Sequence, residues 1–361
     1  MKKLQWFVPL LLIFILGGCG YKDIDKRFFA VGIGIDVAKS NVKKYLVSIK
    51  FAIPSVDKKP NDFMIVSEEA DTIAEAVRVI KTKVDKEVDF SHAKVYLISD
   101  EVAKKRMAPH LYYWPSRRRD FQEIAWVAIG KPTALDVLKV KPKSEQFPSN
   151  WIFMTFGKEG SETPYIFPEF LFDFKKRFTE RGLDPLLPII NARKGYLEVN
   201  RVGLFNKKNL QLQLSLEETK ILNFLFNLES KSAMKVRQGK SYFIIDTQKI
   251  GTSFQINFKN RNHPVIDVFV KVGGKIEEAM FPLHNQDLNQ YGKLAEKTIE
   301  QETKHLLVKM QKANVDPIGF GLRYRSRHFG RNDWQKWRQL YPYVTFRVHA
   351  MVHIEDTGLI E

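Results

Sequence analysis

Two histidines near the end of the chain have the spacing of neighbours on one face of a strand, and histidine is a common metal ligand. His349 and His353 lie in an alternating segment, which separates them by about 13 Å at about 3.3 Å per residue. Ligands so far apart cannot share one zinc ion, and the only cysteine is distant, at position 19. We therefore expect no metal site and interpret both histidines as part of an exposed sheet face.

The glycines Gly32 and Gly34 begin like the fingerprint of a dinucleotide-binding loop, which holds phosphate on backbone amides. Val37 occupies the place of the third glycine, and no Walker lysine follows. A bulge or a close backbone approach within a strand explains such glycines. No Ser-His-Asp or Gly-x-Ser-x-Gly pattern is recognisable, and carboxylate pairs such as Glu277 and Glu278 are typical of solvated surface. The sequence thus predicts neither a cofactor nor an enzymatic activity.

The single cysteine, Cys19, follows a leader with the three parts of a secretory signal. A positively charged start and an apolar run over residues 6–16 precede two glycines. This run is shorter than a membrane span, which needs about 20 residues. The end of the leader resembles the lipobox of bacterial lipoproteins, in which the chain is cut before the cysteine and its thiol carries a diacylglycerol. The resemblance implies a signal peptide over residues 1–18 and lipid attachment at Cys19. The alternative is a buried free cysteine.

The chain is strongly basic, with a formal net charge of +17, and such a charge favours polyanionic partners. An exported protein meets the anionic membrane surface, where each Lys or Arg contributes about 1 kcal/mol. We therefore expect contact with the anionic membrane surface and no nucleic-acid binding. With Cys19 acylated, no thiol remains for a disulfide, so the exported domains must be held together by their cores.

Residues 323–338 interleave arginine with aromatic residues. Arginine, tryptophan and tyrosine are the usual energetic centres of protein interfaces, and the same composition can bind nucleic acid by phosphate pairing and base stacking. Because export is expected, we interpret Arg323, Arg325, Arg327 and Arg331 as a candidate interaction surface. The alternative is a solvated loop whose two tryptophans enter the core.

Periodicity and capping signals predict a mixture of strands and helices. The predicted strands cover residues 28–35, 45–53, 93–98, 123–129, 195–204, 210–214, 242–245, 254–258, 265–272 and 344–355. The predicted helices cover residues 71–88, 133–140, 215–228 and 288–313, with shorter helical stretches after Ser99 and at the end of residues 164–181.

Three of these predictions rest on specific local chemistry. Ser215 and Glu218 fit a capping box, in which each side chain bonds the backbone amide of the other end of the motif. Gly273 and Gly274 are interpreted as a turn after a strand. In residues 344–355 apolar and polar residues alternate strictly, which predicts a strand with its even-numbered face buried.

The order of these elements shows no regular strand–helix alternation, which favours an α+β fold with mixed sheets and packed helices. We predict three domains after the signal peptide. They are an N-terminal α/β domain over residues 19–140, a middle domain over residues 141–205, and a C-terminal α+β domain over residues 206–361 that ends in the long strand.

Several of these features, taken in order, resemble the Ger(x)C family of spore germination lipoproteins. The resemblance spans nearly the whole chain after the leader, although Gly20-Tyr21 departs from the family's usual sequence after the cysteine. The residues that carry it are the lipobox at Cys19, Gly32-Ile33-Gly34-Ile35-Asp36, Gly273-Gly274-Lys275-Ile276-Glu277-Glu278, Asp316-Pro317-Ile318-Gly319-Phe320-Gly321, Trp334, Trp337 and the closing strand.

This resemblance implies the C subunit of a nutrient germinant receptor, a non-enzymatic lipoprotein of three mixed α/β domains. Its implied partners are the membrane-embedded A and B subunits, and its implied location is the outer face of the spore inner membrane. An alternative function is a substrate-binding lipoprotein of an uptake transporter, which would need two similarly wound lobes around a hinge. A third, a lipid-anchored cell-wall enzyme, would need the catalytic signature that we do not find.

Overall fold

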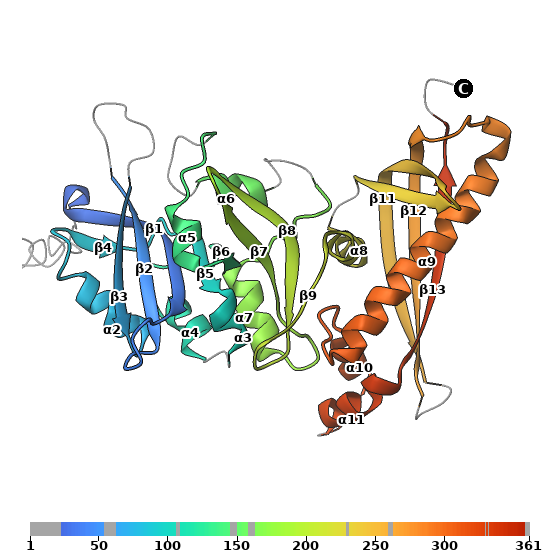
Figure 1. Cartoon of the computed structure of the whole chain (residues 1–361). Helices are drawn as coiled ribbons and strands as arrows, with labels where there is room; N and C mark the ends of the chain where they lie inside the picture. Colours follow the sequence, from blue (N-terminus) through green and yellow to red (C-terminus); the bar gives the residue numbers. More distant parts are fainter. Residues whose placement is uncertain are drawn as a thin grey trace, which may run out of the picture.

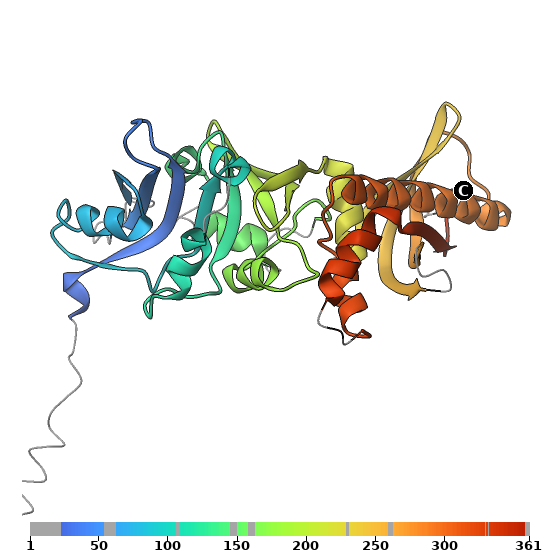
Figure 2. The ribbon, with the colours of Figure 1, turned by 90° about the horizontal axis from the view of Figure 1, so that it is seen from below.

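The computed structural model describes residues 23–53, 63–105, 109–144, 150–157, 163–228, 231–258, 263–328, 330 and 332–357. The described chain forms two sheets with packed helices, and these lie end to end in an elongated molecule (Figures 1 and 2). We refer to residues 23–213 as the N-terminal half and to residues 215–357 as the C-terminal half. The predicted α+β class is confirmed.

The larger sheet belongs to the N-terminal half. Its order is β3-β2-β1-β5-β6-β7-β8-β9, with β4 paired to β1, and the pairings β1–β4, β1–β5, β5–β6 and β6–β7 are parallel. The strands are β1 (Arg27–Val37), β2 (Tyr45–Ala52), β3 (Phe63–Ala70), β4 (Glu87–Asp89), β5 (Val95–Ser99), β6 (Trp126–Lys131), β7 (Leu186–Arg193), β8 (Tyr196–Phe205) and β9 (Leu210–Gln213).

Helices cover both faces of this sheet, so its central strands are apolar on both sides. Val95 and Leu97 of β5 pack in one apolar cluster, and Tyr96 and Ile98 pack in another, as expected for a strand buried on two faces. The helical elements are η1 (Ile24–Lys26), α2 (Ile73–Ile80), α3 (Asp100–Lys104), α4 (His110–Ser116), α5 (Ala134–Lys139), α6 (Asn150–Phe156) and α7 (Leu171–Thr179).

The hairpin predicted from residues 28–35 and 45–53 is confirmed as the antiparallel pair β1–β2. Its register shifts between Ala30 and Gly32, which is the expected bulge. A Cβ on Gly34 would lie 3.0 Å from Leu138, so this glycine lets α5 pack directly on β1. Asp36, at the end of the same strand, accepts hydrogen bonds from the amides of Ala134 (2.7 Å) and Leu135 (2.9 Å) and so fixes the start of α5.

The helix predicted over residues 71–88 is too long, because α2 ends at Ile80. Its apolar stripe is buried as expected, but the hydroxyl of Thr82 donates to the Val79 carbonyl at the helix end. Val88 and Asp89 instead pair with β1 as strand β4. The helix predicted after Ser99 is confirmed as α3, and the Ser99 hydroxyl accepts from the Val102 amide at 3.3 Å.

The sheet continues across the boundary that the sequence predicts between residues 140 and 141. Strand β6, from the predicted N-terminal domain, pairs in parallel with β7, from the predicted middle domain, through Ile129 and Ile189 among others. Hydrogen bonding therefore joins the two segments into one sheet. The division into three domains stays a prediction, and it is not marked by a break in this sheet.

The smaller sheet of the C-terminal half has the order β10-β11-β12-β13, and only its last pairing is parallel. Its strands are β10 (Ser232–Gln238), β11 (Ser241–Asn257), β12 (Val265–Ala279) and β13 (Thr345–Ile354). The helical elements are α8 (Leu216–Phe226), η2 (Asn285–Asp287), α9 (Leu288–Lys312), α10 (Phe320–Arg325), α11 (Asp333–Leu340) and η3 (Tyr341–Tyr343).

Two predictions for this sheet are wrong. The strands predicted over residues 242–245 and 254–258 are parts of the single strand β11, and Gly273-Gly274 lies inside β12 instead of in a turn. A Cβ on Gly274 would lie 2.2 Å from the Asp246 carbonyl oxygen, so this glycine permits a close approach of the two strands. Strand β10 was not predicted.

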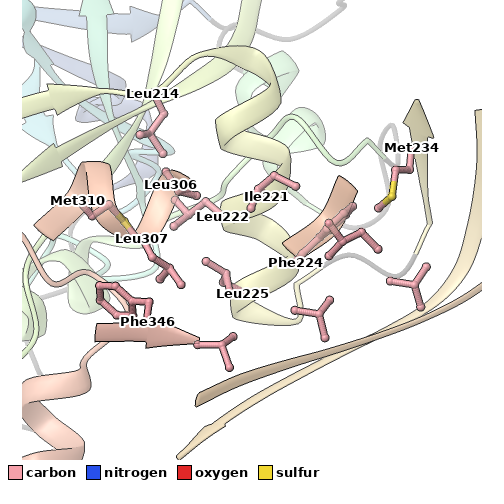
Figure 3. Close-up of a cluster of buried hydrophobic side chains, with 14 of the residues drawn as sticks. Leu214, Ile221, Leu222, Phe224, Leu225, Met234, Leu306, Leu307, Met310 and Phe346 are labelled. Atoms are coloured by element: carbon pink, nitrogen blue, oxygen red, sulfur yellow. The ribbon is translucent and has the colours of Figure 1, made fainter. Parts of the chain in front are cut away.

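The capping box of α8 is confirmed, since the Glu218 amide donates to the Ser215 hydroxyl at 3.3 Å and the Ser215 amide donates to the Glu218 carboxylate at 2.8 Å. The apolar residues of α8 and α9 form one core with the sheet (Figure 3). This core also includes Val202 and Leu204 of β8, so the two halves share buried apolar contacts.

The alternation of the last strand is confirmed in β13. Phe346 and Ile354 are buried and the other even-numbered residues are partly buried, whereas the odd-numbered residues are exposed. Helix α9 lies along this strand, and two of its glutamates accept from outward-facing strand amides. Ala350 donates to Glu300 and Val352 donates to Glu296, both at 3.1 Å.

Candidate functional site at the junction of the two halves

The loop of residues 316–321, which joins α9 to α10, is organised by a buried carboxylate. Asp316 is 3% exposed and accepts hydrogen bonds from three backbone amides, those of Gly319 (2.9 Å), Phe320 (3.0 Å) and Gly321 (2.6 Å). Gly319 has a positive φ of 86°, which glycine adopts without strain. These bonds satisfy free amides at the start of α10, so Asp316 fixes the shape of what we call the junction loop.

The junction loop is bonded to the N-terminal half by a reciprocal pair of hydrogen bonds. The Asp316 amide donates to the Asp184 carboxylate at 2.8 Å, and the Asp184 amide donates to the Asp316 carbonyl at 2.9 Å. A third bond runs from the Leu322 amide to the Gly182 carbonyl at 2.8 Å. The segment before β7 and the segment after α9 are therefore held backbone to backbone.

Two glycines allow this close contact. Gly182 has a φ of 93°, and a Cβ at this position would lie 2.5 Å from the Gly321 carbonyl carbon and from the Leu322 nitrogen. A Cβ on Gly321 would lie 2.6 Å from the ring of Trp337, which is itself 1% exposed and packs against Tyr324. No side chain fits between the two halves here.

Two cations tie helix α7 to the same junction. The Lys207 ammonium donates to the carbonyl oxygens of Arg177, Glu180 and Leu183, the second at 2.7 Å. The Arg177 guanidinium donates to the Pro317 carbonyl at 2.9 Å. Lysine near the last carbonyls of a helix satisfies free acceptors there, so these residues anchor the end of α7 against the junction loop.

Burial shifts the titration of the charged groups in this region. Desolvation raises the pKa of Asp316 to about 7, although its three amide donors act in the opposite direction. Desolvation also raises the pKa of Asp184, and it lowers the pKa of Lys207 to about 8. The junction is therefore a polar contact between the halves. Its acidic and basic side chains are costly to bury in their charged forms.

The predicted arginine surface is only partly free. Arg325 pairs with Glu180 at 2.9 Å across the junction and has a structural role. Arg323 and Arg327 are exposed, and neither side chain forms a hydrogen bond or ion pair with a described residue. Arg331 and Cys19 lie outside the described residues. The structure therefore leaves Arg323 and Arg327 on the surface and uses Arg325 within the fold.

The tryptophans of the same segment divide between two environments. Trp337 is buried at the junction, and Trp334 is partly buried beside it. The alternative interpretation, that these tryptophans enter the core, therefore holds for Trp337. Sequence reasoning missed the partners Asp184 and Lys207, for which no local signal exists. A glycine shortly after a helix end is a known signal for a positive φ, and it could have identified Gly182.

The histidine pair has no convergent geometry. His349 stacks on Phe269 with ring centroids 5.2 Å apart and bonds Asp267 at 3.3 Å. Within the described ranges, no group of three or more His, Cys, Asp or Glu side chains could hold a metal ion. None of the helices in the described part of the chain is long and apolar enough to span a membrane.

Comparison with known proteins matches both halves to one family. A family model described as "Spore germination protein N-terminal domain" matches residues 20–192, and one described as "Spore germination B3/ GerAC like, C-terminal" matches residues 200–358. The second model therefore includes α9, the junction loop and β13, and the first includes Gly182 and Asp184 on the opposite side of the junction.

Individual relatives extend over the full chain. YfkR from Bacillus subtilis (strain 168) is 26% identical over 395 residues, which cover 100% of this chain and 98% of that protein. Spore germination protein KC from the same organism is 24% identical over 398 residues, with coverage of 99% and 96%. The crystal structure of the GerBC protein shares the fold, with a TM-score of 0.55, 17% identity and coverage of 90% of this chain and 98% of that chain. The chain belongs to the Ger(x)C family of spore germination proteins.

Proposed function

We propose that this chain is the C subunit of a nutrient germinant receptor, anchored by a lipid at Cys19 to the outer face of the spore inner membrane. The observation that carries this proposal is the ordered match of both spore germination family models, over residues 20–192 and 200–358. The leader that ends at Cys19 supports the anchor, and the net charge of +17 supports contact with an anionic membrane surface.

We infer that the subunit acts by assembly with membrane-embedded A and B subunits and not by catalysis. The buried Asp316 and the partly buried Lys207 are engaged by backbone groups within the chain, an arrangement that suits a scaffold. The two halves also differ in strand number and strand order. This difference disfavours the alternative of a substrate-binding lipoprotein, which would need two similarly wound lobes.

The anchor can be tested with Cys19→Ala. Without the thiol, no diacylglycerol can be attached, so we expect the variant to lose labelling by a radioactive fatty acid. Its folded body should appear in the soluble fraction, or remain membrane-bound only through its uncleaved leader. Equal labelling of variant and wild type would contradict lipid attachment at this residue.

The partner-facing surface can be tested with the double variant Arg323→Glu and Arg327→Glu. Both side chains are exposed, so charge reversal should spare the fold and weaken docking by about tenfold or more, as expected when charged interface contacts are replaced by repulsion. The measurement is recovery of the A and B subunits with the tagged chain from spore membranes. Arg237→Glu with Arg347→Glu, two exposed arginines on the C-terminal sheet, provides the matched control. Unchanged recovery with the first pair would exclude it as the interface.

A further inference from the structure

Most of the exposed large apolar residues in the described part of the N-terminal half gather at one end of its sheet. Strands β1, β5 and β6 run parallel, with Gly32, Val95 and Trp126 at the same level. The exposed residues lie near the amino ends of these strands, and we call them the amino-end surface. Their exposed fractions range from 36% to 65%, and they are Ile24, Ile53, Val79, Ile124, Phe153 and Phe172.

Three of these residues surround the start of β1. Ile24 lies in η1, directly before β1, and Ile53 directly follows β2, the antiparallel neighbour of β1. Val79 lies in the last turn of α2. At the end of this helix, the Lys81 side chain pairs with Glu87 of β4, which runs beside the first residues of β1. The three apolar side chains therefore belong to one end of the sheet.

The other three residues lie beside the starts of β5 and β6. The Phe172 amide donates to the Glu123 carbonyl at 3.1 Å, which places Phe172 beside Ile124, shortly before β6. The Phe153 ring of α6 lies 4.8 Å from the ammonium of Lys94, which directly precedes β5. Strand β6 is two strand spacings, about 10 Å, from β1. Both groups therefore lie at the same end of the sheet.

Phe172 is the exposed end of a stacked row of aromatic rings. Its ring centroid lies 5.5 Å from that of Phe170, which lies 3.9 Å from Trp126, and Trp126 lies 5.5 Å from Phe156. Trp126 and Phe156 are buried. The core thus supports the exposed ring from below, and exposed apolar residues that gather on one surface are typical of a contact surface.

The proposed anchor indicates what covers this surface. The described body begins at Asp23, and the four residue steps from Cys19 span at most about 14 Å. Element η1 lies at one end of the elongated molecule, opposite the C-terminal half (Figure 2). A lipid at Cys19 would therefore hold the amino-end surface within reach of the bilayer. The other end of β1 lies about 33 Å further along, because this strand has 11 residues.

The charges around the start of β1 have both signs. Lys26 and Lys86 are exposed, and so are Asp25 and Asp85. Attraction to anionic lipids alone therefore does not favour this end of the molecule. Lysine stems can lie along an apolar surface while their ammonium groups remain in water. The surface thus has the composition of a protein face that enters the boundary between lipid headgroups and acyl chains.

We propose that the amino-end surface inserts its apolar side chains into the interfacial region of the lipid bilayer and forms a second membrane contact beside the anchor. Surfaces of this kind reach about 5–10 Å into the headgroup and acyl boundary. The tether alone would let the body rotate, whereas the second contact turns the carboxyl ends of β1 and β5 away from the membrane. This inference rests on the proposed membrane anchoring and adds an orientation to it.

The test uses single-cysteine variants of the full-length lipidated chain, because acylation consumes the thiol of Cys19, the only cysteine. Ile124→Cys and Phe172→Cys are labelled with the fluorophore NBD. The proteins are then placed in vesicles of equal parts phosphatidylcholine and phosphatidylglycerol, in which some lipids carry a quencher high on the acyl chain. We expect blue-shifted emission and several-fold stronger quenching than at the control positions.

The matched controls are exposed apolar residues far from this surface. Val42→Cys is 82% exposed in the wild-type residue and lies in the loop at the other end of β1, and Met351→Cys is 62% exposed in the wild-type residue and lies on β13. Both labels should stay in water. Thermal unfolding checks that each variant folds. If Phe172→Cys does not fold, Ile124→Cys decides, because the Ile124 side chain is 59% exposed.

A charge variant then connects the insertion to its residues. In the Phe172→Cys background, Ile24→Glu with Ile124→Glu should abolish most of the quenching, because carboxylates are costly to move out of water. The same background with Val42→Glu and Met351→Glu is the control, and its quenching should be unchanged. Quenching should also persist in about 1 M salt, where charges are screened beyond about 3 Å.

Three results would overturn the proposal. The first is quenching at Ile124→Cys and Phe172→Cys no stronger than at the controls. The second is quenching that disappears at high salt, which would assign the contact to charge alone. The third is a label that leaves water only when the membrane-embedded subunits are added, which would assign the surface to a protein partner. Failure of the anchor is read separately, because a wild-type chain with unmodified Cys19 would itself take the NBD label.

Discussion

Gly182→Ala is expected to destabilise the folded chain by about 2–5 kcal/mol, because it both strains the backbone and separates the two halves. The φ of 93° is unfavourable for any residue with a Cβ. The new methyl group would also lie 2.5 Å from two backbone atoms of the junction loop. Backbone atoms cannot avoid the methyl group by changing rotamer, so the contact between the halves must open. The loss is measured as the shift in the thermal unfolding midpoint.

Gly195→Ala is the matched control for this change. Gly195 has a similar φ of 81°, but a Cβ there would meet nothing within 4 Å. Its alanine variant therefore carries the backbone strain alone, which costs about 1–2 kcal/mol. The difference between the two variants isolates the contact between the halves. An equal loss of stability in both would show that the junction yields to the methyl group without cost.

Near pH 4, where Asp316 contributes in full, Asp316→Ala is expected to destabilise the chain by about 3–6 kcal/mol. Three buried amides lose their acceptor, and each unsatisfied buried donor costs about 1–3 kcal/mol unless water reaches it. Asp267→Ala provides the control, because among the described residues the Asp267 carboxylate bonds His349 alone, on the exposed sheet face, and its loss should cost less than about 1 kcal/mol. A similar small loss in both variants would mean that Asp316 does not organise the loop.

The pH dependence of the same variant gives a second measure of this carboxylate. Burial raises the pKa of Asp316 to about 7 from an ordinary value of 3.8, so the folded state keeps a proton that the unfolded state releases between these values. The contribution of Asp316 is therefore complete below about pH 4 and declines by up to about 1.4 kcal/mol per pH unit as the pH rises to 7. The gap between wild type and Asp316→Ala should narrow over this range, and parallel curves would contradict the shift.

Local patterns in the sequence were sufficient to predict the elements that are stabilised by contacts between residues close together in the chain. The cap at Ser99, the capping box at Ser215, the first hairpin and the alternation in β13 all depend on residues close together in the chain. The errors arise where distant packing overrides a local signal. Gly273-Gly274 is typical of a turn, but Gly274 lies inside a strand. A glycine is needed there because the neighbouring strand approaches its backbone too closely for a Cβ.

The junction illustrates the same limit for the candidate site. The Asp-Pro-Ile-Gly-Phe-Gly sequence of the junction loop is recognisable, but its role depends on Asp184, which lies 132 positions away in the chain. No periodicity links residues so far apart. The arginines were recognisable by type and spacing, yet Arg325 is used within the fold, in an ion pair with Glu180 from the opposite half.

The glutamates of α9 that bond the outward amides of β13 have a consequence for how copies of this protein can meet. An edge strand with free amides is a template for pairing with another chain and so for open-ended aggregation. In β13 the amides of Ala350 and Val352 are already taken by Glu300 and Glu296. An incoming strand would have to displace two carboxylates before it could add to this sheet. Copies of this protein at high local concentration can thus touch at this edge without polymerising through it.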